Sequence, residues 1–580
     1  MRRPVSRWAP VLAFLLAVTG CSTVPSASST VQITDAPSRP SETVGIEPLP
    51  PEPGATPEEI VRGFVDAAAS VRPGHPVAQQ HLTPAAAKTW SDEAGITILS
   101  PDYATVATEA GAVTLTANPV GTVDPRGVFT VGGTGVFSRQ FNLEQVDGEW
   151  RINNPPDGLI ILQPDFERLY VERDAFFLDP TKQRVVPDPR LLIKGDAQPT
   201  TLIQRILDGP SGYIAAGVRN PLTGFQLRNT VTIRNQAAVV DLTGLPVDPA
   251  PVLSEICAQI VWTLAPLTRT VDIRVDGQSV DIPGVPVAQT VEDWAAFDPD
   301  AVPLDAVGHY LSGGALHTVA AGAPAPGPAG TGVYGLTSAA VSADPRTGKL
   351  SFLVGVRSDA TGAALYAGPY DQELAQVLTA SSLSAPSVAA TRSEAWVVRD
   401  GNDVVRVPAG AAPQAVNAPT LQGLGRADVL RLSPDGVRAA LVVNGPGGHS
   451  LYVGTVVRAE DGSVELRDLR TIAPTLSQVV DVAWRDSGNL LVLASDQRED
   501  RVDPYEVGVD GWGLTDVPTS GLPRPSQPTD IGAAPTRQPL VSAASTGSTG
   551  STIWQLAGGT WVTLVRGAEP LPGTAPFYPL

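Results

Sequence analysis

The C-terminal part of the sequence repeats one pattern, in which a strand, an acidic turn with glycine and a second apolar strand follow one another. The copies lie at 342–354, 386–398, 431–443, 481–493 and 530–554, and the second and last are the weakest. Successive copies are 44 to 50 residues apart, which is the length of one four-stranded propeller blade. A blade cannot bury its faces alone, so the blades must close into a ring. We therefore predict an all-β propeller over 337–580 with five visible blades.

The segment before these repeats, 291–336, has two interpretations. It is either a connector or a sixth, degenerate blade that begins near residue 302. The ring has to close in both cases, because an open blade edge would expose unpaired backbone groups. We expect residues 314–319 to pair with the C-terminal segment and to close it.

Residues 1–20 have the pattern of a lipoprotein signal peptide. Three arginines precede a short apolar run over 9–18, and the small residues Thr19 and Gly20 precede Cys21. The alternative is an uncleaved membrane span, but a span needs about 20 apolar residues and this run is half as long. We predict cleavage before Cys21, S-diacylglycerol on its thiol and an N-acyl group on its amine. Two or more acyl chains anchor a protein stably, which predicts a lipid-anchored protein at the extracytoplasmic face of the cell membrane.

Residues 21–55 are expected to be the lipidated cysteine and a proline-rich tether. The tether has seven prolines and no apolar periodicity, so it cannot bury enough surface to fold. Loss of residues 1–20 removes three arginines and no acid, which changes the net charge from −19 to −22. Nucleic acids and anionic lipid surfaces bind basic patches, so this charge argues against both as partners.

Cys257 is the only cysteine left once Cys21 carries lipid, so the mature chain can form no internal disulfide. It lies in an apolar run over 253–264 whose large residues have helical spacing. A buried structural thiol is therefore preferred over a nucleophile.

Residues 56–157 are predicted to form an α+β domain. A capping box with proline at the first helical position stands at 56–59, and a second helix is expected over 83–90. Strand-like alternation follows and ends in the pattern D-G-x-W-x-I at 147–152. Helices followed by a curved antiparallel sheet with this ending resemble the NTF2-like domains of bacterial lipoproteins. Trp150 is then expected in the core rather than on a ligand platform.

Residues 158–290 are predicted to form a second α+β domain. Its expected elements are strands near 159–162 and 176–178, a helix over 199–208, strands over 231–234 and 238–242, a helix around Cys257 and a hairpin over 271–280. The turn of that hairpin, Asp276–Gly277, is a strong local signal. This β-α-β-β-α-β order resembles the GerMN module of sporulation and germination proteins, on the segments 207–210, 238–242, 259–264 and 275–277. These positions are apolar or turn residues, so they indicate a fold and no site.

No motif in the chain specifies a reaction. The histidines, His75, His81, His309, His317 and His449, are scattered and show no metal-ligand spacing. Asp344, Asp435 and Asp486 recur before glycine in the blade turns, which turn geometry explains better than calcium binding. Propellers also host hydrolases and lyases, but those need clustered acids or histidines at the channel mouth. We predict no catalytic residue, no metal site, no cofactor and no enzymatic activity.

The order of lipid anchor, tether, NTF2-like domain, GerMN domain and propeller resembles the LpqB family of actinobacterial lipoproteins over essentially the whole chain. The resemblance implies an accessory role to the MtrA/MtrB two-component system, through contact with the ectodomain of the sensor kinase MtrB, and an effect on cell-wall homeostasis and cell division. Only Cys21 is carried over as a functional residue; the kinase-contacting surface stays unknown. A lipoprotein that binds cell-wall glycan or peptide, with peptidoglycan as its partner, is the alternative.

Overall fold

The computed structural model describes residues 48–580 except 109–110, 245–249, 304–305, 321, 345–346, 497–500, 524–526, 545–549 and 568. These residues belong to one unit that spans 47–580. The signal peptide, Cys21 and most of the tether lie outside the described residues. Within the described part, no helix combines the length and the apolarity needed to span a bilayer.

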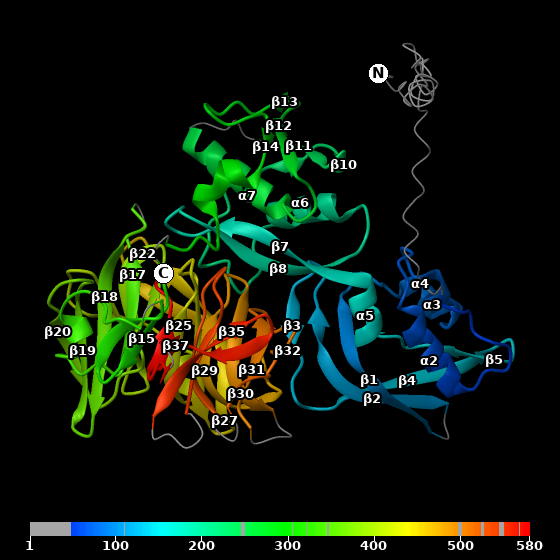
Figure 1. The fold of residues 1–580 in the computed structure, drawn as a ribbon. Coiled ribbons are helices and arrows are strands. Elements are labelled where there is room, and N and C mark those ends of the chain that lie inside the picture. The colour runs from blue at the N-terminus through cyan, green and yellow to red at the C-terminus, as the bar shows by residue number, and fades with distance from the viewer. Residues whose placement is uncertain are drawn as a thin grey trace, which may run out of the picture. The chain divides into compact units, whose positions relative to one another are not determined.

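The first domain places three short helices against a sheet (Figure 1). They are α2 (Pro57–Ala67), α3 (Pro76–Gln80) and α4 (Pro84–Thr89). α2 begins at the predicted capping box, where the Thr56 hydroxyl accepts from the Glu59 backbone N–H and the Glu59 carboxylate accepts from the Thr56 N–H at 2.8 Å. Phe64 lies on the buried face of α2 and packs edge-on against Trp90 and Phe141 in the core of this domain.

The sheet of this domain is formed by β1 (Ile96–Ala107), β2 (Ala112–Val123), β3 (Phe129–Val131), β4 (Phe137–Val146), β5 (Glu149–Ile152) and β6 (Leu159–Leu162). Its order is β5-β4-β2-β1-β6, and β3 also pairs with β2. β6 runs parallel to β1, with Leu159 opposite Ile96, so the first domain extends past the boundary expected at residue 157. The sequence Leu-Ile-Ile-Leu is typical of a buried strand, but such a run does not indicate which sheet it joins. Trp150 on β5 is only partly buried and packs on the edge of the core.

The second domain begins, after α5 (Gln163–Leu169), with a long two-stranded ribbon of β7 (Tyr170–Leu178) and β8 (Val185–Ile193). It continues with α6 (Gln198–Asp208), β9 (Gln226–Leu227), β10 (Thr232–Arg234), β11 (Ala237–Thr243), α7 (Ala250–Leu264), β12 (Thr270–Val275), β13 (Gln278–Ser279), β14 (Ala288–Gln289) and a 3₁₀ helix, η1 (Val291–Phe297). The predicted hairpin turn is present, because Asp276 and Gly277 have positive φ values of 51° and 83°. The helix around Cys257 is α7, and its thiol is fully buried in the core of this domain.

The third domain is a ring of five four-stranded sheets and one three-stranded sheet (Figure 1). The first four-stranded sheet contains β17 (Ser338–Ala343), β18 (Leu350–Asp359), β19 (Gly362–Pro369) and β20 (Ala375–Ala380), and the second contains β21 (Ser387–Ala389), β22 (Arg392–Arg399), β23 (Asp403–Pro408) and β24 (Gln414–Val416). The third contains β25 (Arg426–Leu432), β26 (Arg438–Gly445), β27 (Gly448–Arg458) and β28 (Val464–Thr471), and the fourth contains β29 (Leu476–Trp484), β30 (Asn489–Asp496), β31 (Asp503–Gly508) and β32 (Thr515–Asp516). The fifth contains β33 (Pro528–Gly532), β34 (Leu540–Ala544), β35 (Ser551–Ala557) and β36 (Thr560–Thr563). Short pieces complete it: η2 (Pro328–Thr331), η3 (Leu421–Gly423) and the hairpin of β37 (Val565–Arg566) and β38 (Glu569–Pro570). The predicted fold class, two α+β domains followed by a propeller, is confirmed.

The sixth sheet closes the ring by joining the two ends of the propeller. Its strands are β39 (Thr574–Phe577), β15 (His309–Ser312) and β16 (Ala315–Thr318), with β15 in the middle. The C-terminal strand therefore pairs with residues 309–312, and the expected pairing with 314–319 is wrong by one strand. Gly313 and Gly314, with φ values of 58° and 80°, form the turn that folds β16 back on the outer side of β15. Residues before 337 thus contribute a blade, as one of the two interpretations of 291–336 allowed.

Candidate functional site

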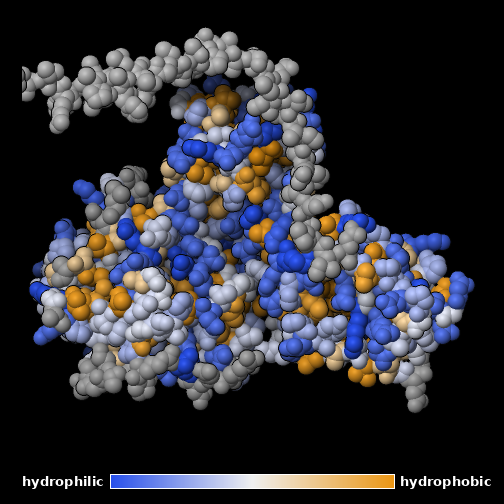
Figure 2. All heavy atoms as spheres, turned by 45° about the vertical axis from the view of Figure 1, so that its right-hand side comes forward, coloured by the Kyte–Doolittle hydropathy of each residue, from blue (hydrophilic) through white to orange (hydrophobic). Residues whose placement is uncertain are grey.

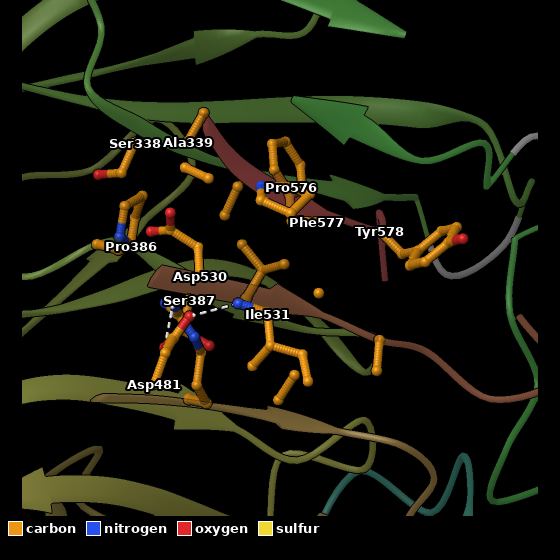
Figure 3. A pocket seen from close by; sticks show the side chains of 18 of the residues that line it. Ser338, Ala339, Pro386, Ser387, Asp481, Asp530, Ile531, Pro576, Phe577 and Tyr578 are labelled. Carbon is orange, nitrogen blue, oxygen red and sulfur yellow. Dashed lines mark hydrogen bonds and ion pairs between the residues drawn. The ribbon is translucent and has the colours of Figure 1, made fainter. Parts of the chain in front are cut away.

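The inner strands of the propeller surround a small cavity of about 130 Å³ (Figure 3). Its lining includes Ser338, Ser387, Asp481, Asp530 and Tyr578, which come from five different strands or loops around the ring. Pockets that hold small molecules usually have about 300–1,000 Å³, so this cavity is below that range.

The acidic groups in this cavity connect strands of the ring. Asp481 on β29 accepts a hydrogen bond from Arg431 of β25 at 3.1 Å and another from the backbone N–H of Ile531 on β33 at 3.0 Å (Figure 3). Burial raises the pKa of Asp481, and Arg431 partly offsets this effect. Asp530 accepts from the hydroxyl of Ser542. Asp481 therefore joins neighbouring sheets and Asp530 joins two strands of one sheet, so both carboxylates have protein partners instead of a free reactive position.

A second polar region lies where the second domain meets the propeller. Arg438 of β26 donates to the backbone carbonyl of Pro187 on the ribbon, and the Thr455 hydroxyl donates to the carbonyl of Tyr213. The guanidinium of Arg470 lies 3.9 Å from the ring centre of Tyr213, in cation–π contact. These contacts join the ribbon and the loop after α6 directly to the third four-stranded sheet of the ring.

Four carboxyl groups face one another in this junction, which we call the ribbon junction. Glu172 and Asp174 are alternate residues of β7, so both lie on one face of the ribbon. Burial raises the pKa of Glu172 to about 8, with further contributions from Asp510, Asp174 and Asp486. Burial likewise raises the pKa of Asp174 to about 7, although Arg438 opposes the shift. At neutral pH Glu172 is therefore mostly protonated and Asp174 is close to its midpoint. Clusters of perturbed carboxyls of this kind occur often at functional sites.

Asp510 is the most buried carboxyl group of the ribbon junction. Its side chain is 6% exposed, one oxygen accepts from the Trp512 N–H at 2.9 Å, and the other has no hydrogen-bond partner among the described residues. Burial raises its pKa, while Arg470 lowers it. In the described part of the chain no group of three or more His, Cys, Asp or Glu side chains has a geometry that fits a metal ion.

The local sequence contains only a weak signal for the ribbon junction. Glu172 and Asp174 are two acids at alternate positions of one strand, with Arg173 between them, ahead of the apolar run 175–178. Their partners Asp486 and Asp510 lie more than 300 residues later, so no local pattern connects them.

The three turn aspartates have the structural role expected of them. Each accepts a backbone N–H two or three residues ahead: Asp344 from Thr347 at 2.9 Å, Asp435 from Val437 at 2.8 Å and Asp486 from Gly488 at 2.9 Å. Such bonds close tight turns and explain the recurrence of aspartate before glycine.

The histidines have separate local partners. His75 pairs with Asp92 at 2.7 Å, His81 with the Val77 carbonyl at 3.0 Å, His309 with the Tyr370 hydroxyl at 2.7 Å, His317 with the Gly322 carbonyl at 3.1 Å and His449 with Asp428 at 3.2 Å. Cys257 is a free thiol whose pKa burial raises to about 12, which agrees with a structural role. Cys21, the predicted lipidation site, lies outside the described residues.

Apolar side chains do not reveal a docking surface on the face drawn in Figure 2, where they are scattered among hydrophilic residues. The most exposed large ones in the described part, Leu49, Val106, Val136 and Val333, belong to separate loops and strands.

Comparison with known proteins connects the three domains to one group of proteins. The family model "Lipoprotein LpqB, N-terminal domain" matches residues 50–167, "Sporulation and spore germination" matches 174–281, and "Lipoprotein LpqB beta-propeller domain" matches 314–579. Lipoprotein LpqB of Rhodococcus opacus (strain B4) is 32% identical over 550 residues, which cover 89% of this chain and 88% of the relative. Lipoprotein LpqB of Mycobacterium tuberculosis (strain CDC 1551 / Oshkosh) is 31% identical over 560 residues, which cover 89% of this chain and 90% of the relative. Similarity of this extent, in all three domains and in the same order, shows that the chain belongs to the LpqB family of lipoproteins.

Proposed function

We propose that this protein is a lipoprotein of the extracytoplasmic membrane face that regulates the MtrA/MtrB two-component system by contact with the ectodomain of the kinase MtrB, and thereby affects cell-wall homeostasis and cell division. The observation that carries the proposal is membership of the LpqB family over 89% of the chain. A protein that acts by contact with a partner needs no reactive site of its own. The polar clusters described above agree with such a function, because they hold the parts of the molecule together.

The anchor is part of the proposed mechanism. Lipid on Cys21 would hold the protein and a membrane-embedded kinase in the same membrane, which raises their effective concentration for each other. A weak affinity between the two ectodomains would then be sufficient. Loss of the lipid is therefore expected to reduce signalling even when the ectodomain folds normally.

A wall-binding function is the second candidate, and one cavity favours it. A groove of about 750 Å³ lies where all three domains meet, lined among others by Thr97, Arg126, Asp157, Tyr213 and Arg470. Its volume falls within the usual range of ligand pockets, and pockets are frequent at domain interfaces. A peptide or glycan fragment of the wall would fit this size class, whereas the cavity inside the ring is too small.

The test compares kinase-dependent reporter output in cells that express the wild-type protein, Cys21→Ala, the neighbouring control Ser22→Ala, or no lipoprotein. The proposal predicts altered output without the lipoprotein, a similar defect with Cys21→Ala, and normal output with Ser22→Ala. Purified ectodomain should also be captured by the kinase ectodomain and not by peptidoglycan. Equal output in all four strains, with capture by peptidoglycan alone, would replace the kinase function with the wall-binding one.

A further inference from the structure

The groove of about 750 Å³ where the three domains meet has one wall from each domain. The first domain supplies residues 94–97, 122–126 and Asp157, the second supplies 211–213, and the propeller supplies 468–470. These segments include the start of β1, the end of β2, the loop after α6 and part of β28. We call this cavity the three-domain groove. A ligand that fills it would contact all three domains at once.

Direct contacts between the domains hold these walls in place. Arg126 of the first domain donates to the backbone carbonyl groups of residues 208–210 in the second. The hydroxyl groups of Thr130 and Tyr213 are hydrogen-bonded at 2.8 Å, and the Tyr213 carbonyl accepts from Thr455 of the propeller. The three-domain groove is therefore formed before a ligand enters, as most small-molecule sites are.

The charged groups around the three-domain groove nearly balance one another. Its lining contains three carboxylates and two guanidinium groups, which belong to Asp124, Asp157, Asp468, Arg126 and Arg470. Both cations already have protein partners, because Arg470 lies over the Tyr213 ring and donates to the Val509 carbonyl at 3.2 Å, and Arg126 makes the bonds described above. An anionic ligand would compete with these partners and would meet three carboxylates. The lining therefore favours a ligand without net charge.

The polar groups that line the three-domain groove are suited to binding hydroxyl groups. Asp157 and Asp468 are both exposed, one in the first domain and one in the propeller. An ionised carboxylate accepts charge-assisted hydrogen bonds from hydroxyl groups, and such bonds are shorter and stronger than those between neutral groups. Thr97 and Thr122 add hydroxyl groups that both donate and accept. Neighbouring hydroxyl groups on a sugar ring supply the matching donors and acceptors.

Tyr213 adds an aromatic surface to this lining. Its side chain is half-buried, and the Arg470 guanidinium lies 3.9 Å from the centre of its ring. The cation covers one face of the ring, so only the other face is available to a ligand. The face of an aromatic ring is negative and attracts the C–H groups of a sugar ring, which carry partial positive charge. An aromatic ring beside carboxylates and hydroxyl groups suits a saccharide better than an apolar or an anionic ligand.

We propose that the three-domain groove binds an uncharged saccharide, which stacks on Tyr213 and donates hydroxyl hydrogen bonds to Asp157 and Asp468. The inference rests on the wall-binding candidate for the function, and it narrows the ligand of that candidate from peptide or glycan to glycan. Because Asp157 and Asp468 belong to different domains, the bound saccharide links the first domain to the propeller.

The first experiment titrates tri-N-acetylchitotriose with the purified full chain, in a detergent without a sugar headgroup, and follows saturation-transfer NMR of the sugar. Wild-type protein should transfer saturation, and Asp157→Asn and Asp468→Asn should each weaken binding about tenfold. Asparagine tolerates the positive φ of 55° at position 468, so this variant keeps the local conformation. Asp102→Asn is the matched control, because Asp102 is exposed on β1 outside the groove and its replacement changes the net charge equally. No transfer with wild type, or the same affinity in the two groove variants and the control, would overturn the proposal.

A second pair of variants tests the role of the Tyr213 ring. Tyr213→Phe loses the hydrogen bond to Thr130 and keeps the ring, so it should bind the sugar nearly as well as wild type. Tyr213→Leu loses the aromatic face and should bind at least tenfold more weakly. Equal weakening in both variants would assign the effect to the hydroxyl group and overturn the stacking.

A neutral peptide separates this inference from the function on which it rests. The probe is trialanine that is acetylated at its N-terminus and amidated at its C-terminus. Binding of the sugar at least tenfold more tightly than the peptide supports the saccharide ligand. Tighter binding of the peptide overturns it and leaves the wall-binding candidate with a peptide ligand, whereas binding of neither probe overturns both. The kinase function is tested separately by the reporter strains.

Discussion

Arg438 of the propeller donates a hydrogen bond to the backbone carbonyl of Pro187, which lies 251 residues earlier on the ribbon of the second domain. The arginine is 2% exposed, and its charge acts on Asp174 of the ribbon and Asp435 of its own turn. One side chain therefore serves as a cation of the ribbon junction, beside Arg470, and as a direct link between two domains.

Replacement of Arg438 should loosen this link. Arg438→Met leaves the Pro187 carbonyl without its donor and two buried carboxyls without their cation, which is expected to cost about 3–5 kcal/mol. Urea unfolding of the full chain measures the loss. Arg357→Gln removes an exposed pair with Asp359 and the contact of the guanidinium with the Tyr366 ring, 5.8 Å from its centre, and should cost about 1 kcal/mol. Similar losses for the two variants would contradict the assigned role of Arg438.

The ribbon junction should make stability fall as the pH rises. Glu172 and Asp174 have ordinary pKa values of 4.5 and 3.8, which become about 8 and about 7 in the folded protein. Between about pH 4 and 8 these two groups therefore bind more protons in the folded protein than in the unfolded chain, and the stability that they contribute is lost through this window as the pH rises. Glu172→Gln and Asp174→Asn should flatten the dependence in thermal unfolding from pH 5 to 8. Glu460→Gln, at an exposed position, should leave the dependence unchanged. The same dependence on pH in wild type, Glu172→Gln and Asp174→Asn would refute the prediction.

His309 should act in the opposite direction on the acid side. Burial lowers its pKa from 6.5 to about 4, so the unfolded chain binds the proton first as the pH falls. Stability contributed by neutral His309 is then lost between about pH 6.5 and 4. His309→Gln should show a smaller loss of melting temperature than wild type over this range, when each protein is compared with itself at pH 7. The control is His449→Gln, because this histidine is more exposed than His309. An identical loss of melting temperature on acidification in all three proteins would argue against the role of His309.

The Cys257 thiol should be unreactive in the native protein. It is fully buried and its pKa is raised to about 12, so almost no thiolate exists at pH 8. We expect no labelling by a thiol-specific disulfide reagent under native conditions and one equivalent in urea. Labelling of the native protein at the rate of a free thiol would show that α7 opens readily.

Several local features could be predicted from the sequence because neighbouring residues encode them. The capping box at Thr56 and Glu59 needs only residues three positions apart, and it forms as expected. The Asp276–Gly277 turn follows from the tolerance of both residues for positive φ. The spacing of the blades is visible in the sequence because three of the four-stranded sheets repeat the same aspartate turn, at Asp344, Asp435 and Asp486.

Other features depended on partners that are distant in the chain. The run Leu159–Leu162 is a strand in either domain, and only its parallel pairing with Ile96–Leu99 places it in the first one. The strand that closes the ring is 309–312 and not 314–319, because the Gly313–Gly314 turn puts the later strand outside.

The amino-acid sequence by itself determined the domain order, the turns, the helix caps and the number of regular blades, since these depend on residues within a few positions or on a fixed repeat. Tertiary structure decided which sheet each strand joins and which charges face one another, as between Glu172 and Asp510. The physical reason is that an isolated acid or arginine in a sequence has its ordinary chemistry. Its pKa and its need for a partner change only when folding buries it beside charges from remote parts of the chain.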